Sequence, residues 1–324
     1  MTSFAHQIKN ELVRQLLSKR CCAAAELRAF LQISGKLSLG SKMTKIILQT
    51  QSPSVARRVF LLFKLCFRIS PEILSCRRIK FQKKGTFILQ VTGRNEVFRI
   101  LQELGFMKNN PENNRPVLVP HYSQQSVVQE LGGKCCRRAY LRGAFLAGGS
   151  LNDPKTGYHL EIVAPSEPYA KAIKNVMASF ELKVRYFRRK DDFVIYLKGG
   201  EGIGEFLRII AAHNALLMFE NIRVVKGVRN KINRLVNCET ANLTKTVFAS
   251  HEQIRNIKLI EGKIGLKKLP PSLFQAAQLR LSFPEATMQE LGDLADPPLS
   301  KSSINHRLRR INALAEKYKE NGQL

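Results

Sequence analysis

The chain has 324 residues, 44% of them hydrophobic and 24% charged, a balance typical of folded globular domains rather than of disordered chains. The 53 Lys and Arg residues outnumber the 25 Asp and Glu residues, which gives a net charge of +28. So basic a chain is expected to bind a polyanion, nucleic acid above all, while a ribosome-associated or merely solvated basic surface is the alternative. The apolar runs are too short to span a bilayer, so no membrane partner is expected.

The first residues and the cysteines indicate a compartment. Apolar residues from Phe4 onward have helical spacing with charges between them, which differs from a signal peptide. The chain has seven cysteines, an odd number, so reduced thiols are expected. We therefore predict a cytoplasmic, nucleoid-associated protein.

An internal repeat occupies the first two-thirds of the chain. Segment 21–37 matches segment 135–151 without a gap, and seven of the seventeen paired residues are identical. The same offset of 114 residues pairs 46–48 with 160–162, and the similarity continues with small gaps. Self-similarity of this kind indicates two copies of one structural unit.

Each copy is predicted to fold as αββαββα. The first helix ends at Gly35 or Gly149, a hairpin follows, and a second helix begins after Ser52 or Ser166. A second hairpin of alternating strands and a last helix close the unit. The predicted first and last helices cover 21–34 and 95–104 in one copy and 135–148 and 203–213 in the other. The expected fold class is α+β, a pseudo-symmetric duplicated domain followed by an all-α helix-turn-helix domain.

Small side chains recur along the first helix of each copy. Ala139, Gly143 and Ala147 are spaced by four residues, as are Ala25 and Ala29, so each set lies on one helix face. Stripes of small residues allow two helices to approach closely. We therefore predict that the two copies join through these helices, with separate core packing of each helix as the alternative.

The second copy opens with Leu-x-Gly-x-Phe-Leu-Ala-Gly-Gly at 141–149. An αββαββα unit with this start resembles the LAGLIDADG homing-endonuclease domain. The resemblance implies paired helices, a saddle of two sheets over the DNA major groove, and an acidic metal ligand near the end of each helix. Ser34 and Gly148 occupy those acidic positions, and the nearby Glu26 and Asp153 lie at a helix start and in a loop. We expect no enzyme activity, an active metal-dependent endonuclease being the alternative.

Two pairs of adjacent cysteines belong to the repeat. Cys21-Cys22 and Cys135-Cys136 lie at the starts of the predicted first helices. Zinc sites usually take spaced pairs such as C-x2-C, and adjacent side chains on a helix point about 100° apart. We therefore predict ordinary packing of these cysteines, with no metal, no cofactor and no small-molecule ligand.

The character of the chain changes after Val225. The residues that follow are rich in asparagine, and apolar spacing then predicts a helix over 243–264. Basic residues outnumber acidic ones by 17 to 9 over 226–324 and by 36 to 16 in the rest of the chain. The predicted domains are 1–130 and 131–225 for the two repeats, 226–266 for a linker and helix, and 267–324 for the helix-turn-helix.

Three helices with clear end signals are predicted in the last domain. Pro270-Pro271 begins the first, Thr287 and Glu290 form a capping box for the second, and Ser300 caps the third. An apolar stripe on the third helix leaves a polar, cationic face outward. The predicted DNA-binding residues are Ser300, Lys301, Ser302, Ser303, Asn305, His306, Arg307, Arg309 and Arg310.

These residues are expected to divide between bases and phosphates, because the early residues of such a helix lie nearest the floor of the groove. The leading candidates for base contacts are Ser302, Asn305, His306 and Arg309. The candidates for phosphate contacts are Lys301, Arg307 and Arg310. A solvated basic face without a DNA partner is the alternative.

Long motifs along the whole chain identify a family. They lie at 138–150, at 158–161, at 299–309 and, most specific, at 233–243 with the sequence Asn-Arg-Leu-Val-Asn-Cys-Glu-Thr-Ala-Asn-Leu. They resemble the WhiA sporulation and cell-division regulators of Gram-positive bacteria. The resemblance implies a degenerate homing-endonuclease domain, a helix-turn-helix similar to the promoter-binding domain of sigma factors, and double-stranded DNA as partner.

The resemblance also implies a function in transcription during sporulation, or in cell division and chromosome segregation, with an RNA polymerase sigma factor as a protein partner. A protein-interaction module that acts in division without DNA is a separate hypothesis. A chain lacking 270–324 that still rescued a deletion strain would favour it.

Overall fold

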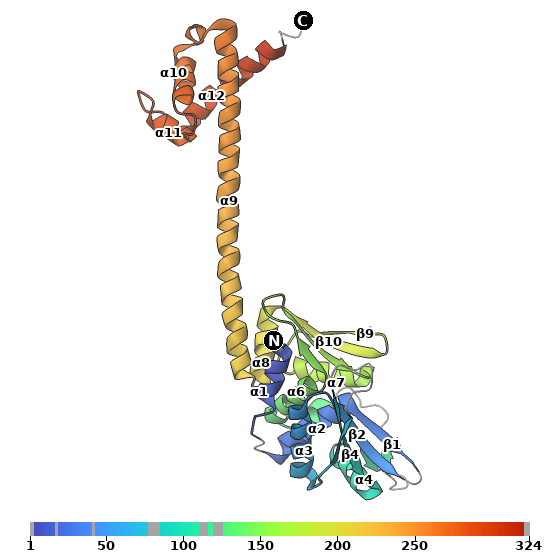
Figure 1. The fold of residues 1–324 in the computed structure, drawn as a ribbon. Helices are drawn as coiled ribbons and strands as arrows, with labels where there is room; N and C mark the ends of the chain where they lie inside the picture. The colour runs from blue at the N-terminus through green and yellow to red at the C-terminus, as the bar shows by residue number, and fades with distance from the viewer. Residues whose placement is uncertain are drawn as a thin grey trace. The chain divides into compact units, whose positions relative to one another are not determined.

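A computed structural model describes most of the chain, and its elements are drawn in Figure 1. The described residues are 3–16, 19–40, 43–76, 85–109, 116–118 and 126–320. The chain divides into two compact units, here called the repeat unit, Met1–Lys226, and the C-terminal unit, Gly227–Leu324. Each unit is described by itself.

The repeat unit contains two copies of the predicted αββαββα arrangement (Figure 1). The first copy consists of α2 (Arg20–Ser34), β1 (Gly35–Leu39), β2 (Thr44–Thr50), α3 (Pro53–Phe67), β3 (Glu72–Cys76), β4 (Thr86–Thr92) and α4 (Arg94–Glu103). The second consists of α6 (Lys134–Gly148), β7 (Gly149–Leu151), β8 (His159–Ala164), α7 (Glu167–Ala178), β9 (Arg185–Arg189), β10 (Asp192–Lys198) and α8 (Gly200–Ile209). The other short elements are α1 (Phe4–Leu12), β5 (Met107–Asn109), β6 (Pro116–Leu118) and α5 (Ser126–Glu130).

Both copies build the same four-stranded antiparallel sheet. The strand orders are β1-β2-β4-β3 and β7-β8-β10-β9, which are identical once the copies are aligned. Leu48 pairs with Leu89 in the first sheet and Ile162 with Ile195 in the second, and all four are buried. Because strand side chains alternate between faces, these residues define the face that packs on the helices. The duplication predicted from sequence is therefore a duplication of the fold.

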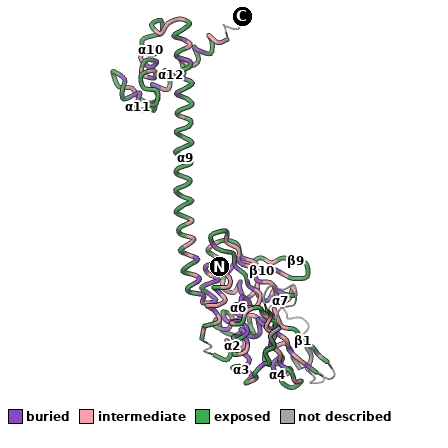
Figure 2. The backbone as a smooth tube through the Cα atoms, viewed as in Figure 1, coloured by how far each residue is buried: buried purple, intermediate pink, exposed green. Residues whose placement is uncertain are grey.

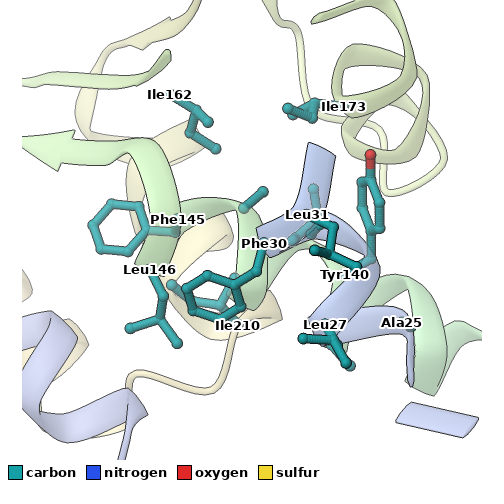
Figure 3. Packing of buried hydrophobic residues seen from close by; sticks show 14 of the residues in the cluster. Ala25, Leu27, Phe30, Leu31, Tyr140, Phe145, Leu146, Ile162, Ile173 and Ile210 are labelled. Atoms are coloured by element: carbon teal, nitrogen blue, oxygen red, sulfur yellow. The ribbon is translucent and has the colours of Figure 1, made fainter. Parts of the chain in front are cut away.

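The helices α2 and α6 pack against each other at the centre of the repeat unit. A Cβ atom on Gly143 would lie 2.3 Å from the carbonyl oxygen of Glu26 and 3.1 Å from the Cβ of Ala29. Only glycine allows so close an approach of the two backbones. The predicted pairing through small residues is confirmed, and Figure 3 shows Phe30 of α2 and Phe145 of α6 in the core around the pair.

A buried ion cluster ties three helices of the repeat unit together. The Glu26 side chain is fully buried, and its carboxylate lies 2.8 Å from Nε of Arg58 on α3 and 2.7 Å from Nη2 of Arg142 on α6. Arg142 also donates a 2.9 Å hydrogen bond to Oε1 of Gln15. A buried carboxylate between two cations is stable only while all partners remain. Glu26 was expected at a helix start but lies near the middle of α2, and the cluster itself was not predicted.

The helix α9 (His213–Ile264) differs from the expected linker and helix over 226–266. It is continuous from His213 although asparagine has a low helix propensity, so the expected start near 243 was wrong. Residues 227–245 are exposed (Figure 2), whereas Ile257 and Ile260 are buried in the core of the C-terminal unit. The remaining elements of that unit are η1 (Leu266–Lys268), α10 (Pro271–Ser282), α11 (Met288–Asp293) and α12 (Lys301–Glu320).

Among the described residues, the helices are either too short or too polar to cross a membrane.

Candidate nucleic-acid interface

The helices α10, α11 and α12 form a compact helix-turn-helix around one apolar core. Leu273 of α10, Leu291 of α11 and Ile304 of α12 are all buried in it. The predicted capping box is present: the backbone N–H of Glu290 donates to Oγ1 of Thr287 at 3.3 Å, and that of Thr287 donates to Oε2 of Glu290 at 2.7 Å. The bond from the Thr287 backbone lowers the pKa of the Glu290 carboxyl.

A buried arginine holds the turn between α10 and α11. Arg280 is 1% exposed, and its guanidinium donates to the carbonyl oxygens of Ala286 at 2.7 Å and Pro284 at 3.3 Å. Burial lowers the pKa of Arg280 from its usual value. The burial of Arg280 was not predicted, because an isolated arginine among apolar neighbours in the sequence gives no sign of it.

The turn between α11 and α12 is fixed by close backbone contact. The backbone N–H of Leu299 donates to the carbonyl oxygen of Gly292 at 2.9 Å, and a Cβ atom on Gly292 would lie 2.2 Å from the oxygen of Leu299. Nε2 of Gln275 on α10 donates to the oxygen of Asp296 at 2.6 Å. These contacts set the direction in which α12 leaves the turn.

The first turn of α12 is capped as predicted. Oγ of Ser300 accepts a 3.2 Å hydrogen bond from the backbone N–H of Ser303 and lies 2.9 Å from Oγ of Ser302. Ser300, Lys301 and Ser302 are exposed. The amides of a first helical turn and its positive dipole end favour phosphate oxygens, so this end of α12 suits a DNA backbone.

The outward face of α12 lies opposite its buried stripe. Ile304, Leu308 and Ile311 are buried, whereas His306 and Arg309 are exposed on the opposite side of the helix. The predicted base-contacting residues form this face: Ser302, His306 and Arg309 are exposed and Asn305 is half-buried. Hydroxyl, amide, imidazole and guanidinium groups are those that bind base edges in a major groove.

Arg307 is placed differently from the other predicted residues. Its Nη1 donates to Oε1 of Gln275 at 2.9 Å and to the carbonyl oxygen of Ser272 at 3.3 Å, which ties α12 to α10. Lys301 and Arg310 are exposed and make no such contact with α10 among the bonds described. The predicted phosphate contacts are therefore better served by Lys301 and Arg310 than by Arg307.

The second sheet of the repeat unit carries cations on its face away from the helices. Tyr186 of β9 donates to Oε1 of Glu167 on α7, so its neighbour Arg185 points to the other face, and Arg189 lies on that face too. Arg189 pairs with Glu161 of β8 at 3.0 Å in an exposed ion pair. This face therefore combines cations with an acid.

Of the two positions at which the resemblance implies acidic metal ligands, both lack a carboxylate and Gly148 also lacks room for one. Oγ of Ser34 donates to the oxygen of Phe30 at 3.0 Å. A Cβ atom on Gly148 would lie 2.5 Å from the carbonyl oxygen of Val163 and 2.9 Å from Cγ2 of Ile33. A carboxylate side chain does not fit there unless the packing changes.

Neither of the two acids near these positions replaces the lost ligands. Glu26 is enclosed by Arg58 and Arg142, and Asp153 accepts a 2.8 Å hydrogen bond from the backbone N–H of Lys155 in an exposed loop. Among the described residues, the group of side chains close enough to hold a metal ion consists of cysteines.

That group brings together cysteines which sequence analysis expected to diverge. The Sγ atoms of Cys21, Cys22 and Cys136 lie within 4.8 Å of one another. Burial raises the pKa of the Cys22 thiol to about 11, whereas hydrogen bonds to Cys22 and Cys136 lower that of the exposed Cys135. The prediction for the cysteines treated each helix alone and did not combine the two pairs with the predicted pairing of α2 and α6.

Family models match most of the chain. A WhiA N-terminal LAGLIDADG-like domain matches 20–107, a WhiA LAGLIDADG-like domain matches 137–229, and a WhiA C-terminal HTH domain matches 232–315. A probable cell division protein WhiA from Natranaerobius thermophilus is 44% identical over 99% of this chain and 97% of its own length. The chain belongs to the WhiA family.

Other relatives and solved structures agree with this assignment. The probable cell division protein WhiA of Desulforamulus reducens is 43% identical over 97% of this chain and 96% of its own. The crystal structure of full-length DUF199/WhiA from Thermatoga maritima covers 98% of this chain and 99% of its own, with a TM-score of 0.58 and 26% identity. A structure of the N-terminal LAGLIDADG domain of DUF199/WhiA (TM-score 0.50, 21% identity) covers 65% of this chain and 91% of its own, and shows the fold alone.

Proposed function

We propose that this protein is a non-enzymatic, sequence-specific DNA-binding regulator of transcription and that α12 is its recognition helix. The observation that carries the proposal is the outward face of α12, where Ser302, His306 and Arg309 are exposed opposite the buried stripe. The capped turns hold this face rigidly, as a recognition helix in the major groove requires.

Within that face we assign two kinds of contact. Ser302, Asn305, His306 and Arg309 would bind base edges, since arginine pairs with guanine and asparagine with adenine. Lys301 and Arg310 would bind phosphates together with the amide end of α12, and Ser300 and Ser303 would chiefly hold that end in shape. The basic repeat unit would add affinity for the DNA backbone or bind a protein partner.

The absence of catalysis is part of this proposal. Its support is that Ser34 and Gly148 offer no carboxylate and that Gly148 has no space for one. Incubation with Mg²⁺ and duplex DNA should leave the DNA intact. A Mg²⁺-dependent nuclease activity that copurifies with the wild-type chain would contradict this part of the proposal.

The cellular process is proposed from the relatives. The curated relatives are called probable cell division proteins, so we propose a function in cell division, chromosome segregation or sporulation, on the nucleoid. The similarity of the helix-turn-helix to promoter-binding domains suggests an RNA polymerase sigma factor as protein partner. Retention of a purified sigma factor on resin that carries the full chain, but not on the resin alone, would support that partner.

Fluorescence anisotropy with duplexes selected from genomic DNA tests the recognition helix. Asn305→Ala and Arg309→Ala should each weaken binding by about 1–3 kcal/mol, roughly 5- to 150-fold, and relax the preference at one base position. Lys301→Ala should weaken binding to all sequences and reduce the salt slope by about one.

Lys258→Ala is the matched control, because Lys258 is an exposed cation of α9 in the same unit and is not one of the residues assigned to DNA contact. It should bind like the wild type. If Asn305→Ala and Arg309→Ala bind as tightly and selectively as Lys258→Ala, the recognition helix is wrongly assigned.

A further inference from the structure

Four cysteines from the two copies of the repeat meet at one end of the central helix pair. Cys21 and Cys22 lie in the first turn of α2, and Cys135 and Cys136 lie in the first turn of α6. The two pairs occupy equivalent positions 114 residues apart, so the pairing of α2 with α6 brings them together.

Three of the four thiols are close to one another, because the Sγ atoms of Cys21, Cys22 and Cys136 lie within 4.8 Å. The fourth, Cys135, lies beside Cys136 in the first turn of α6 and lines the same pocket as Cys22. In a tetrahedral site with Zn–S bonds of about 2.3 Å, neighbouring sulfurs are about 3.8 Å apart. Zinc binding therefore requires side-chain rotations that shorten these separations and bring the sulfur of Cys135 to the same ion.

We propose that Cys21, Cys22, Cys135 and Cys136 bind one zinc ion as thiolates and thereby join the N-terminal ends of α2 and α6. A closed set of four cysteines is the ligand set of structural zinc sites. The four also differ in exposure: Cys136 is buried and Cys21 and Cys135 are exposed, so the ion can enter from solvent.

The charge around the cluster fits a zinc thiolate site. A zinc ion with four thiolates has a net charge of about −2, which needs nearby cations when it is partly buried. Lys19 and Arg138 line the same pocket as Cys22 and Cys135. Each copy of the repeat supplies half of the ligands, and the site is complete only when both copies are packed together.

A disulfide uses the cluster less well. A disulfide joins sulfurs in pairs at about 2.05 Å, whereas three of these sulfurs are mutually close, as ligands of one ion are. The zinc site would stabilise the packed repeat unit, because an ion that binds only the folded form adds its binding free energy to stability. The proposed zinc site does not depend on the proposed binding of DNA by α12.

Cobalt titration of the full chain, purified reduced and under inert gas without chelators, tests the site. Co²⁺ should produce the thiolate charge-transfer and tetrahedral d–d absorption bands at one ion per chain, and Zn²⁺ should displace it. The control Cys238→Ser, which removes an exposed cysteine of α9, should keep these bands. Cys22→Ser/Cys136→Ser should lose them. Absence of the bands in the wild-type chain would overturn the proposal.

Alkylation mapped by mass spectrometry is a second test of the zinc site. It uses the wild-type chain, so its outcome does not depend on whether a variant folds. Added Zn²⁺ should protect Cys21, Cys22, Cys135 and Cys136 from iodoacetamide and leave Cys238 reactive. Equal labelling with and without Zn²⁺ would contradict the site. Disulfides among the four cysteines in a glutathione buffer of cytosolic potential would also contradict it, and would assign the cluster to redox chemistry instead.

Discussion

The C-terminal end of α6 and the outward face of α12 differ in how tightly they are packed. At the end of α6, Gly148 packs so tightly against Val163 that even a methyl group does not fit. On α12, His306 and Arg309 remain exposed opposite a buried stripe. The position of Gly148 has no space for a carboxylate side chain, whereas α12 presents polar side chains at the surface. Tight packing at Gly148 agrees with the proposed absence of catalysis, and the exposed face of α12 agrees with the proposed DNA binding.

The two units also differ in the hydrogen-bond partners of their buried charged residues. In the repeat unit, Glu26, Arg58 and Arg142 satisfy one another in the interior. In the C-terminal unit, Arg280 and Arg307 donate to carbonyl and amide oxygens that hold turns and helices in place. Arg280 and Arg307 thus support the helix-turn-helix, whereas Arg309 and Arg310 are exposed on α12.

The largest expected effect is on the buried ion cluster. Glu26→Ala leaves Arg58 and Arg142 without their carboxylate and should destabilise the repeat unit by about 3–5 kcal/mol. Glu103→Ala, which removes the exposed partner of Arg20, should cost no more than about 1 kcal/mol. Urea unfolding of both variants measures the difference. Equal stabilities would show that the cluster does not hold the paired helices.

Gly148→Ala tests the filled site directly. The added methyl group meets the carbonyl oxygen of Val163, so overpacking should cost about 1–3 kcal/mol. Gly157→Ala is the control, because a Cβ atom there meets no atom within 4 Å. Thermal unfolding compares the two. A Gly148→Ala chain as stable as Gly157→Ala would mean that the position retains room for a ligand side chain.

Thr287→Ala tests how rigidly the second helix is held. Loss of the side-chain half of the capping box should destabilise the C-terminal unit by about 1 kcal/mol. Thr244→Ala removes an exposed threonine of α9 outside any cap and should change stability little. Hydrogen exchange of α11 amides measures the local effect. Unchanged protection in Thr287→Ala would show that the box is not needed.

A pH-dependent effect concerns Lys9, a half-buried cation of α1. Burial lowers the pKa of Lys9 to about 8, so the unfolded chain binds a proton more readily than the folded one between about pH 8 and 10.5. Stability should therefore rise with pH over that window in the wild type relative to Lys9→Met. The two chains are compared by urea unfolding at both pH values. A constant difference in stability would contradict the lowered pKa.

Sequence predicted the features that rest on local chemistry. The identities between 21–37 and 135–151 indicated the duplication, Gly143 indicated the helix pairing, and Thr287 with Glu290 indicated a cap. The residues on the outward face of α12 followed from helical spacing alone. Their contacts with DNA remain a prediction.

The missed features depend on contacts between distant segments. The cysteine cluster and the Glu26 cluster form only when α2 meets α6, and the spacing within either helix does not indicate them. The hydrogen bond from Arg307 to Gln275 depends on the packing of α12 against α10, which the spacing within α12 does not indicate. The start of α9 at His213 was missed because asparagine-rich sequence scores poorly as helix, although Phe219 near its start and Ile260 near its end are each buried in a core.

Chromatin immunoprecipitation with sequencing tests the central claim most directly. The strain expresses either the wild-type chain or Asn305→Ala/Arg309→Ala from the native locus, with Lys258→Ala as control. The wild type and the control should occupy the same discrete promoters with a shared sequence motif, and the double variant should lose them at equal protein level. The same peaks and motif in the double variant would show that α12 does not determine where this protein binds DNA.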